Sequence, residues 1–319
     1  MKAVVYDRYG STDQLRVTEL PAPMPRAGEV LVEVVATSVN LSDWEALHGS
    51  PAYARFGGLR VPRRHILGSD IAGRVVALGP GDSPFQVGDA VYGDNLQRLG
   101  GFAEYAVASA SALALKPAEL SFAEASAIPQ SGAIALQAVA RASAGDRMLI
   151  NGGGGGTGSF AIQLAKSAGV HVTAVDAAGK LDFMRDLGAD EVIDYRTRDF
   201  TRTGPYDLII DLVARRSVFA YRRALAVGGR YFMVGGTART LLRLVTLGSA
   251  VGALTGTRLG VLMVRQGPEH FSSLVERIRE GAVRVRIDRV FPLEQVPAAL
   301  AYHGEGRALG KVLIAVRDA

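Results

Sequence analysis

The sequence predicts an α/β protein in which an open parallel β-sheet, with helices on both faces, is inserted between two parts of an irregular β-barrel or sandwich. Three observations carry this prediction. The first third contains short β-branched runs separated by turn residues, the middle alternates strand and helix patterns, and the pattern changes again near the C-terminus. The predicted domains are 1–120 with 267–319, and 121–266. A chain of 319 residues is long enough for two such domains.

The first third consists of predicted strands joined by tight turns. Its β-branched runs are bounded by turn-forming clusters such as Pro21-Ala22-Pro23 and Gly88-Asp89. Strands at this spacing favour an irregular barrel or sandwich over βαβ units. The expected strands are 2–6, 30–39, 71–78, 90–92 and 103–107.

From residue 121 onward, strands alternate with helices. Ser121 is expected to cap a helix, and Glu124 three residues later completes a capping box. An apolar strand at 147–151 runs directly into a glycine-rich turn, beyond which residues 159–168 have helical periodicity. This alternation is typical of a doubly wound parallel sheet. The further expected helices are 132–142, 180–187 and 217–226, and the further expected strands are 171–176, 191–194, 207–212 and 230–234.

The C-terminal segment is expected to rejoin the first domain, with helices near 269–280 and 293–302 and strands at 284–290 and 311–316. Residues 241–264 are apolar overall but carry Arg243 and Arg258, whereas a membrane helix needs about 20 apolar residues without central charges. We expect a helix or loop followed by a strand there, and no membrane segment. The apolar run after Met1 is too short for a signal peptide, so the expected location is the cytoplasm.

Composition excludes several classes of function. The chain has no cysteine, which rules out disulfides, thiolate nucleophiles, iron–sulfur clusters and cysteine-ligated zinc. Its five histidines include no pair at a metal-binding spacing such as HxxxH, so no protein-bound transition metal is expected. Arg215, Arg216, Arg222 and Arg223 are spaced to share one helix face. Nucleic-acid binding needs a basic stripe on a recognisable module, so we expect only a solvated helix face and no nucleic-acid partner.

The glycine-rich turn at 152–158 follows an apolar strand and opens an amphipathic helix. Its glycines satisfy the dinucleotide-binding pattern GxGxxG and a related spacing that starts one residue earlier. Such glycines allow a tight turn, close approach of the backbone to a pyrophosphate, and close packing of helix on strand, while the phosphates bind N–H groups at the helix N-terminus. The alternative is a simple flexible loop. The expected cofactor-binding residues of this turn are Gly152, Gly153, Gly155, Gly156, Thr157 and Gly158.

Asp176 ends the next expected strand, at the distance beyond the last glycine where dinucleotide-binding proteins place an acidic residue. A carboxylate there accepts hydrogen bonds from the adenosine ribose and repels a 2′-phosphate, which favours NAD(H) over NADP(H). Lys180 and Arg185 are close enough in sequence to receive a 2′-phosphate, so NADP(H) stays an alternative. A purely turn-forming role for Asp176 is the other interpretation.

Several further motifs extend over nearly the whole chain. With the glycine turn, they make the sequence resemble the medium-chain dehydrogenase/reductase superfamily, and within it the zinc-free quinone oxidoreductase branch. The resemblance implies a GroES-like β-barrel catalytic domain into which a Rossmann domain, the doubly wound parallel sheet, is inserted. The motifs are Asn40-Leu41-Ser42-Asp43-Trp44, Leu67-Gly68-Ser69-Asp70, Val87-Gly88-Asp89, Gly101-Phe102-Ala103-Glu104-Tyr105, Leu187-Gly188-Ala189-Asp190 and Gly310-Lys311-Val312.

The sequence departs from the zinc alcohol dehydrogenases of that superfamily at the ligand positions. Where those enzymes carry Cys, His and a third Cys or Asp, this chain has Asn40, Ser69 and Gln130, none of which is a good zinc ligand. The resemblance therefore implies no zinc. Without a Lewis acid, the easier acceptor is one whose negative charge delocalises, such as a quinone or an α,β-unsaturated carbonyl. Hydrogen-bond donors can stabilise the developing enolate or phenolate.

The resemblance also implies roles for individual residues. Asn40 and Asp43 are expected to shape the acceptor pocket, with turn capping as their alternative role, and Ser131 completes the candidate catalytic set. Relatives carry Lys or Tyr where this chain has Glu45, so the proton donor is left open among Tyr53, His48, Ser131 and water. The remaining expected cofactor contacts are Lys180 and Tyr195 on the adenosine side, and Leu212, Val213, Val234, Gly235 and Gly236 near the nicotinamide.

The predicted function is NAD(P)H-dependent reduction of a small-molecule quinone or activated alkene. The alternatives are an enoyl or ketone reductase that tailors a larger metabolite, and a non-catalytic NAD(P)H-binding redox sensor. The resemblance implies a homodimer joined through a sixth strand at 257–264, whose apolar run equally suits a buried core strand. The non-periodic segment 51–64 is interpreted either as a mobile substrate-binding loop or as a surface excursion.

Overall fold

The structure, a computed structural model, describes residues 1–317 and divides into two compact units. Unit 1 comprises Met1–Ala133, Gln266–Glu276 and the chain from Val285 onward, and unit 2 comprises Ile134–Arg265 and Arg277–Arg284. The α/β fold class is confirmed, because unit 2 contains a parallel sheet and unit 1 a mainly antiparallel one. The domain bounds 1–120 with 267–319, and 121–266, stay a prediction.

Unit 1 is organised around β3 (Glu29–Val39), a long and largely buried strand. β3 pairs antiparallel with β4 along one edge, and with β6 and β15 on successive parts of the other. The pairing of β15 with β3 returns the C-terminus to the first part of the chain, as the sequence predicts. The other strands of unit 1 are β1 (Lys2–Val5), β2 (Arg16–Glu19), β4 (Asp70–Leu78), β5 (Ala90–Asp94), β6 (Tyr105–Ser109), β7 (Leu113–Leu115), β14 (Ile287–Pro292) and β15 (Lys311–Ala315).

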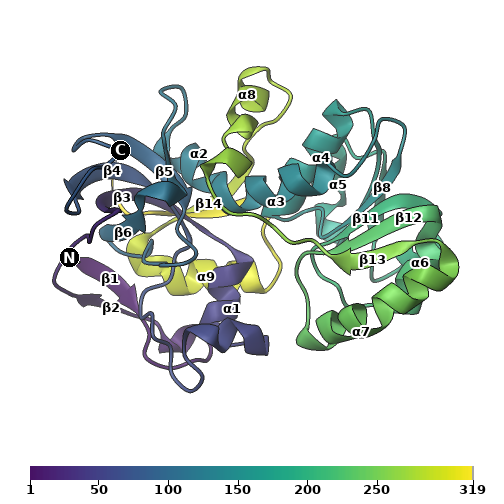
Figure 1. The fold of residues 1–319 in the computed structure, drawn as a ribbon, viewed down its shortest axis with the longest axis horizontal. Coiled ribbons are helices and arrows are strands. Elements are labelled where there is room, and N and C mark those ends of the chain that lie inside the picture. Colours follow the sequence, from purple (N-terminus) through teal and green to yellow (C-terminus); the bar gives the residue numbers. More distant parts are fainter. Residues whose placement is uncertain (318–319) are drawn as a thin grey trace. The chain divides into compact units, whose positions relative to one another are not determined.

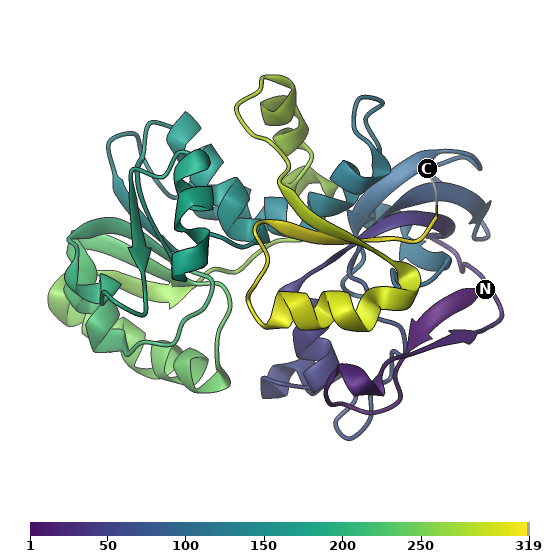
Figure 2. The same cartoon turned by 180° about the vertical axis from the view of Figure 1, so that it is seen from behind.

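Helices of unit 1 cover this sheet and position its polar residues. α1 (Leu41–His48) begins directly after β3 and packs beside α9 (Val296–Gly304), which lies along β14 and β15 (Figure 2). α2 (Phe122–Ala127) has the predicted capping box, in which Ser121 Oγ accepts from the Glu124 N–H at 3.1 Å. Two further helices cross the boundary between the units, α3 (Pro129–Val139) and α8 (Ser273–Arg279).

Unit 2 is a doubly wound parallel sheet in the order β10-β9-β8-β11-β12-β13. The chain runs outward from β8 to β10, then returns beside β8 and runs outward from β11 to β13, so the strand order reverses between β8 and β11. Helices α4 and α5 lie on one face, and α6 and α7 on the other (Figure 1). The strands are β8 (Arg147–Asn151), β9 (His171–Asp176), β10 (Glu191–Asp194), β11 (Tyr206–Asp211), β12 (Leu225–Met233) and β13 (Arg258–Val261); the helices are α4 (Gly156–Ser167), α5 (Leu181–Asp186), α6 (Val218–Ala224) and α7 (Ala238–Thr255).

Several local predictions need correction. The short strands β2 and β7 were not predicted, and β12 begins at Leu225 because α6 ends earlier than its apolar pattern suggests. Arg215 and Arg216 precede α6, so they do not share a helix face with Arg222 and Arg223. The helix expected at 269–280 is a 3₁₀ turn followed by the shorter α8.

The apolar segment 241–264 forms most of α7 and then β13, as predicted. Within residues 1–317, no helix combines the length and the hydropathy that crossing a membrane requires. The segment 51–64 contains a short 3₁₀ helix, Ala52–Gly57.

Candidate functional site

The glycine turn of unit 2 lies where the strand order of the sheet reverses. It leaves the carboxyl end of β8 and enters α4, for which Gly155 is the N-cap. Gly152 has φ +92°, a left-handed conformation that favours glycine, and the Gly152 and Gly153 N–H groups donate to Val175 O at 2.9 and 3.1 Å. The first N–H groups of a helix have no partner within the helix, so the start of α4 offers donors to an anion.

The glycines of this turn have different surroundings. A Cβ on Gly158 would lie 2.4 Å from Gly152 O, and one on Gly153 would lie 2.9 Å from Met184 Sδ, so both positions serve close packing. A Cβ on Gly155 would meet only Gly152 O, at 3.7 Å. Gly155 therefore borders open space that a side chain would fill, as expected where a backbone approaches a pyrophosphate. The residues present fit a dinucleotide.

Asp176 holds the glycine turn at the end of β9. Its Oδ2 accepts from the Gly154 N–H at 3.0 Å, and its Oδ1 accepts from the Ala177 N–H at 2.8 Å. The buried Lys180 places its ammonium 3.7 Å from Asp176 Oδ2. Asp176 therefore has the turn-forming role considered for it, and its role in binding the adenosine ribose stays a prediction. Lys180 offsets part of the negative charge that would repel a 2′-phosphate.

A buried carboxylate that the sequence analysis missed organises the next loop. Asp211 ends β11, and its Oδ1 accepts from the Asn151 Nδ2 at 2.7 Å and from the Val213 and Ala214 N–H groups at 3.0 and 2.7 Å. This fixes the expected contact residues Leu212 and Val213 beside the glycine turn, where a Cβ on Gly152 would lie 3.1 Å from Leu212 Cβ. A sequence signal was available, because β8 and β11 each end in a polar residue directly after three apolar residues.

The other expected cofactor residues of unit 2 follow the carboxyl ends of neighbouring strands. Tyr195 follows β10 and is 42% exposed, and Val234, Gly235 and Gly236 follow β12. In a parallel sheet these ends share one edge, which is where ligands bind in doubly wound folds. The structure therefore brings the predicted residues of unit 2 to one edge.

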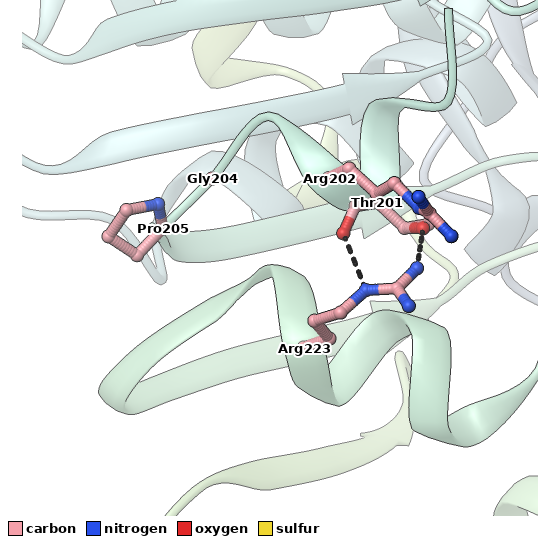
Figure 3. Close-up of a pocket in the computed structure, with 5 residues that line it drawn as sticks. All are labelled: Thr201, Arg202, Gly204, Pro205 and Arg223. Atoms are coloured by element: carbon pink, nitrogen blue, oxygen red, sulfur yellow. Dashed lines mark hydrogen bonds between the residues drawn. The ribbon is translucent and has the colours of Figure 1, made fainter.

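A surface pocket of about 510 Å³ lies at the opposite end of β11. It is lined by Thr201, Arg202, Gly204, Pro205 and Arg223, and the Arg223 guanidinium donates to Thr201 O and Oγ1 (Figure 3). None of its lining residues belongs to the glycine turn, so we do not assign it to the nucleotide.

Unit 1 contains the candidate catalytic residues within a buried polar cluster, hereafter the Asn40 cluster. Asp43 is fully buried: its Oδ2 accepts from the Asn40 N–H at 2.9 Å and from Ser69 Oγ at 3.1 Å, and its Oδ1 accepts from the Gly68 N–H at 3.0 Å. Asn40 and Asp43 form the N-terminal capping box of α1, so the capping role considered for them is present. The cluster comprises Asn40, Ser42, Asp43, Ser69, Asp70, Gln130, Ser131 and Lys311.

Lys311 supplies the only ammonium of the Asn40 cluster. Its Nζ is buried and donates to Asn40 Oδ1 at 2.6 Å and to Ser131 Oγ at 3.2 Å, and it lies 3.8 Å from Asp70 Oδ2. The amide nitrogen of Asn40 donates to Ser69 Oγ at 3.0 Å and to Asp70 Oδ2 at 2.8 Å. The polar atoms of the Asn40 side chain are thus all engaged within the cluster.

Burial dominates the electrostatics of this region. It raises the pKa of Asp43 to about 7 and that of Asp94, opposite Asp70 on β5, also to about 7. The pKa of Asp70 is likewise raised by burial, although the Lys311 charge opposes the shift. Burial lowers the pKa of Lys311, and the three carboxylates oppose that change.

The candidate proton donors Tyr53, His48 and Ser131 have different surroundings. Tyr53 donates to Glu45 Oε1 at 3.0 Å, and burial raises the pKa of Glu45 to about 7. His48 Nδ1 lies 2.9 Å from Trp44 O. Ser131 is buried beside Lys311, so of the three it alone belongs to the Asn40 cluster.

Comparisons with known proteins agree with this architecture. Family models described as an alcohol dehydrogenase GroES-like domain and a zinc-binding dehydrogenase match residues 26–118 and 187–314. The chain is 33% identical to the chloroplastic quinone-oxidoreductase QR1 of Triphysaria versicolor, over 98% of each chain. It is 32% identical to the 2-methylene-furan-3-one reductase of Solanum lycopersicum, over 98% of this chain and 79% of that protein. The solved quinone oxidoreductase of Coxiella burnetii superimposes with a TM-score of 0.90 at 31% identity, over 99% of both chains.

Proposed function

Because the chain belongs to the quinone oxidoreductase-like branch of the medium-chain dehydrogenase/reductase superfamily, we propose that it reduces a quinone or α,β-unsaturated carbonyl without zinc and with a preference for NADH. Its relatives are quinone oxidoreductases and reductases of conjugated alkenes, so the chain is an NAD(P)H-dependent oxidoreductase of this kind. Beyond this activity we propose the preference for NADH, the absence of zinc and the roles of individual residues.

The observation that carries the proposal is the open space at Gly155, at the start of α4 and at the point where the strand order reverses. The glycine turn and Thr157 would hold the pyrophosphate, Asp176 and Tyr195 the adenosine half, and the loops after β11 and β12 the nicotinamide half. When bound, the cofactor supplies a hydride. The protein orients the reactants and stabilises the charge that develops.

The donor set argues against zinc in the Asn40 cluster. Asn40, Ser69 and Gln130 offer amide and hydroxyl groups, which bind zinc poorly. The amide oxygen of Asn40 already accepts from the Lys311 ammonium at 2.6 Å, and this positive charge would repel a metal ion. Within residues 1–317, no three His, Cys, Asp or Glu side chains are grouped to hold a metal. We therefore propose that hydrogen bonds stabilise the acceptor's developing charge. The predicted catalytic residues Asn40, Asp43 and Ser131 are buried, so we propose that they position the groups that touch the acceptor.

The proposed NADH preference rests on Asp176, whose carboxylate would bind the ribose diol and repel a 2′-phosphate. The nearby Lys180 ammonium moderates this discrimination. We also propose a homodimer formed through β13, because this strand is at the edge of the sheet and pairs along one side only, with β12.

Steady-state turnover tests the proposed function. We expect oxidation of NADH with quinones, enals or enones, a lower kcat/KM for NADPH, and negligible turnover with simple ketones. Oxidation only in the presence of simple ketones, or a preference for NADPH, would contradict the corresponding part of the proposal.

A further inference from the structure

Ser69 occupies the centre of a row of hydrogen bonds that leads from buried Asp43 toward the surface. Ser69 Oγ donates to Asp43 Oδ2 at 3.1 Å, and Ser42 Oγ lies 3.3 Å from Ser69 Oγ on the other side. Asp43 is fully buried, whereas Ser42 is half-buried. The row therefore connects an acid that water does not reach with a hydroxyl that is partly accessible.

Lys311 restricts how the hydrogens of this row are arranged. An ammonium only donates, so its contact with Asn40 Oδ1 requires the Asn40 amide nitrogen to face Ser69. Ser69 Oγ consequently always accepts from Asn40 and has one hydrogen left to donate. That hydrogen has two destinations, Asp43 Oδ2 when the acid is ionised and Ser42 Oγ when the acid is protonated. When the acid is protonated, Ser69 accepts from Asp43 as well as from Asn40, and the Ser42 hydrogen is free to point to Gln130 Oε1. When the acid is ionised, the single Ser42 hydrogen has two acceptors, Ser69 Oγ at 3.3 Å and Gln130 Oε1 at 3.0 Å.

The side chain of Gln130, which contacts Ser42, carries a donor that lacks a partner among the described residues. Ser42 Oγ donates to Gln130 Oε1 at 3.0 Å, while Gln130 Nε2 is buried and makes no hydrogen bond with any group in the described part of the chain. A buried unsatisfied donor costs free energy, and an acceptor atom from a ligand would remove that cost. A carbonyl oxygen beside Ser42 and Gln130 would accept from Gln130 Nε2, and it would accept from the Ser42 hydroxyl when that hydrogen turns away from Gln130 Oε1.

We infer that Gln130 and Ser42 bind the carbonyl oxygen of the acceptor, and that Ser69 passes a proton from Asp43 to Ser42 and on to that oxygen. This inference rests on the proposed function. Gln130 and Ser42 touch the acceptor, whereas Asp43 and Ser69 act through Ser42. The Asn40 cluster then has a second role besides capping α1. Asp43 holds one proton, and Ser69 transfers it to Ser42.

The reaction balances with one hydride and one proton. As the hydride reaches the conjugated carbon or quinone ring, electrons move onto the acceptor oxygen. The Ser42 hydroxyl gives its hydrogen to that oxygen, Ser42 takes one from Ser69, and Ser69 takes one from the Asp43 carboxyl. The products are an enol or hydroquinone, the oxidised cofactor and the Asp43 carboxylate. Water then reprotonates Asp43 through the same row, and an enol becomes the saturated carbonyl in solution.

The electrostatic environment supports a stored proton. Burial raises the pKa of Asp43 to about 7, and the negative charge of Asp70 adds to this effect. Lys311 is the cationic group that faces Asp43 within the cluster. Asp94 and Tyr6 also interact with the cluster, and burial raises the pKa of each. Asp43 is thus protonated in a large share of molecules at neutral pH, and the share falls as the pH rises through about 7.

The decisive experiment compares Ser69→Ala with Ser38→Ala. Ser38 Oγ donates to Asp70 Oδ2 at 2.9 Å in the same buried region but lies outside the row, so it is a matched control. Infrared spectroscopy follows the carbonyl band of protonated Asp43, identified by its loss in Asp43→Asn, as it exchanges with D₂O. We expect slower exchange in Ser69→Ala and wild-type exchange in Ser38→Ala. Wild-type exchange in Ser69→Ala would overturn the relay, and this readout does not depend on turnover.

Turnover provides the second readout. We expect Ser69→Ala to lower kcat with an enone on the order of 10²-fold, the range for loss of a general acid, with little change in cofactor affinity. Gln130→Leu is expected to raise KM for the acceptor. If Tyr53→Phe abolishes turnover while Ser69→Ala keeps it, the proton comes through the Glu45–Tyr53 pair and the relay is overturned. If the wild-type protein shows proton exchange through Ser69 but reduces no acceptor, the proposed function is overturned instead.

Discussion

The two units of this protein define their candidate sites in different ways. In unit 2 the backbone defines the site: glycines without side chains, helix N–H groups and strand ends present donors and space to a cofactor. In unit 1 side chains define the site, because the Asn40 cluster joins residues from α1, β4, α3 and β15 by buried hydrogen bonds. A backbone site tolerates most changes except an added Cβ. A buried side-chain network depends on every charge and donor within it.

The largest expected effect comes from a side chain at Gly155. Gly155→Val fills the open space where the backbone approaches a phosphate, and its φ of −88° suits any residue. We expect cofactor affinity to fall by at least about 100-fold, as for the loss of roughly 3 kcal/mol of binding free energy. The melting temperature should hardly change. Fluorescence titration with NADH and thermal unfolding measure the two effects.

Gly158→Val is the matched contrast, because its Cβ would lie 2.4 Å from Gly152 O and should destabilise the fold itself. If Gly155→Val binds NADH as the wild type does, the glycine turn is not the phosphate site.

The largest expected effect on stability is at Lys311. Lys311→Met leaves Asp70 buried without its cationic partner, and breaking a buried ion pair typically costs about 3–5 kcal/mol of the free energy of unfolding. Denaturant unfolding measures this loss. Lys2 pairs with Glu294 at 2.6 Å on the surface, and Lys2→Met should change stability little. Equal effects of the two substitutions would show that the Asn40 cluster does not depend on its ammonium.

A smaller effect is expected on cofactor choice. Asp176→Ser removes the carboxylate that would repel a 2′-phosphate and leaves Lys180 free to attract one. We expect the ratio of kcat/KM for NADH over NADPH to fall about tenfold, corresponding to roughly 1.4 kcal/mol. Asp186→Ser, which removes an exposed carboxylate at the end of α5, serves as a control. An unchanged ratio in Asp176→Ser would show that Asp176 does not discriminate between NADH and NADPH.

The last expected effect is on the pH dependence of stability. The pKa of Asp94 is raised to about 7, so the folded state keeps this proton while the unfolded state releases it near pH 4. Stability contributed by Asp94 is therefore lost as the pH rises from about 4 to about 7. In Asp94→Asn we expect the free energy of unfolding to fall less steeply with pH, as measured by denaturant unfolding across this range. A wild-type slope in the variant would show that Asp94 ionises normally.

Much of unit 2 could be predicted from the sequence because its signals are local. A glycine turn between an apolar strand and an amphipathic helix, followed by Asp176 at the next strand end, lies within a short stretch of chain. The strands β2 and β7 were missed because they have three or four residues and partly exposed faces, and they form only by pairing with distant partners.

The chemistry of unit 1 was less predictable because its contacts are remote in sequence. Asn40 and Lys311 meet through the pairing of β3 with β15, and no spacing rule connects positions 271 residues apart. The one local signal was a lysine that begins the apolar strand β15. The roles of Ser42, Gln130 and Asp211 likewise required the folded structure, because serine, glutamine and aspartate at such positions usually cap turns.

The central claim is that this protein transfers hydride to a conjugated acceptor without a metal, and one measurement tests it most directly. The rate of NADH oxidation with a quinone or enone should be compared before and after removal of metals with EDTA, with zinc content determined by mass spectrometry. We predict an unchanged kcat in protein that contains less zinc than active sites. Loss of turnover on chelation, with recovery on adding stoichiometric zinc, would contradict the claim.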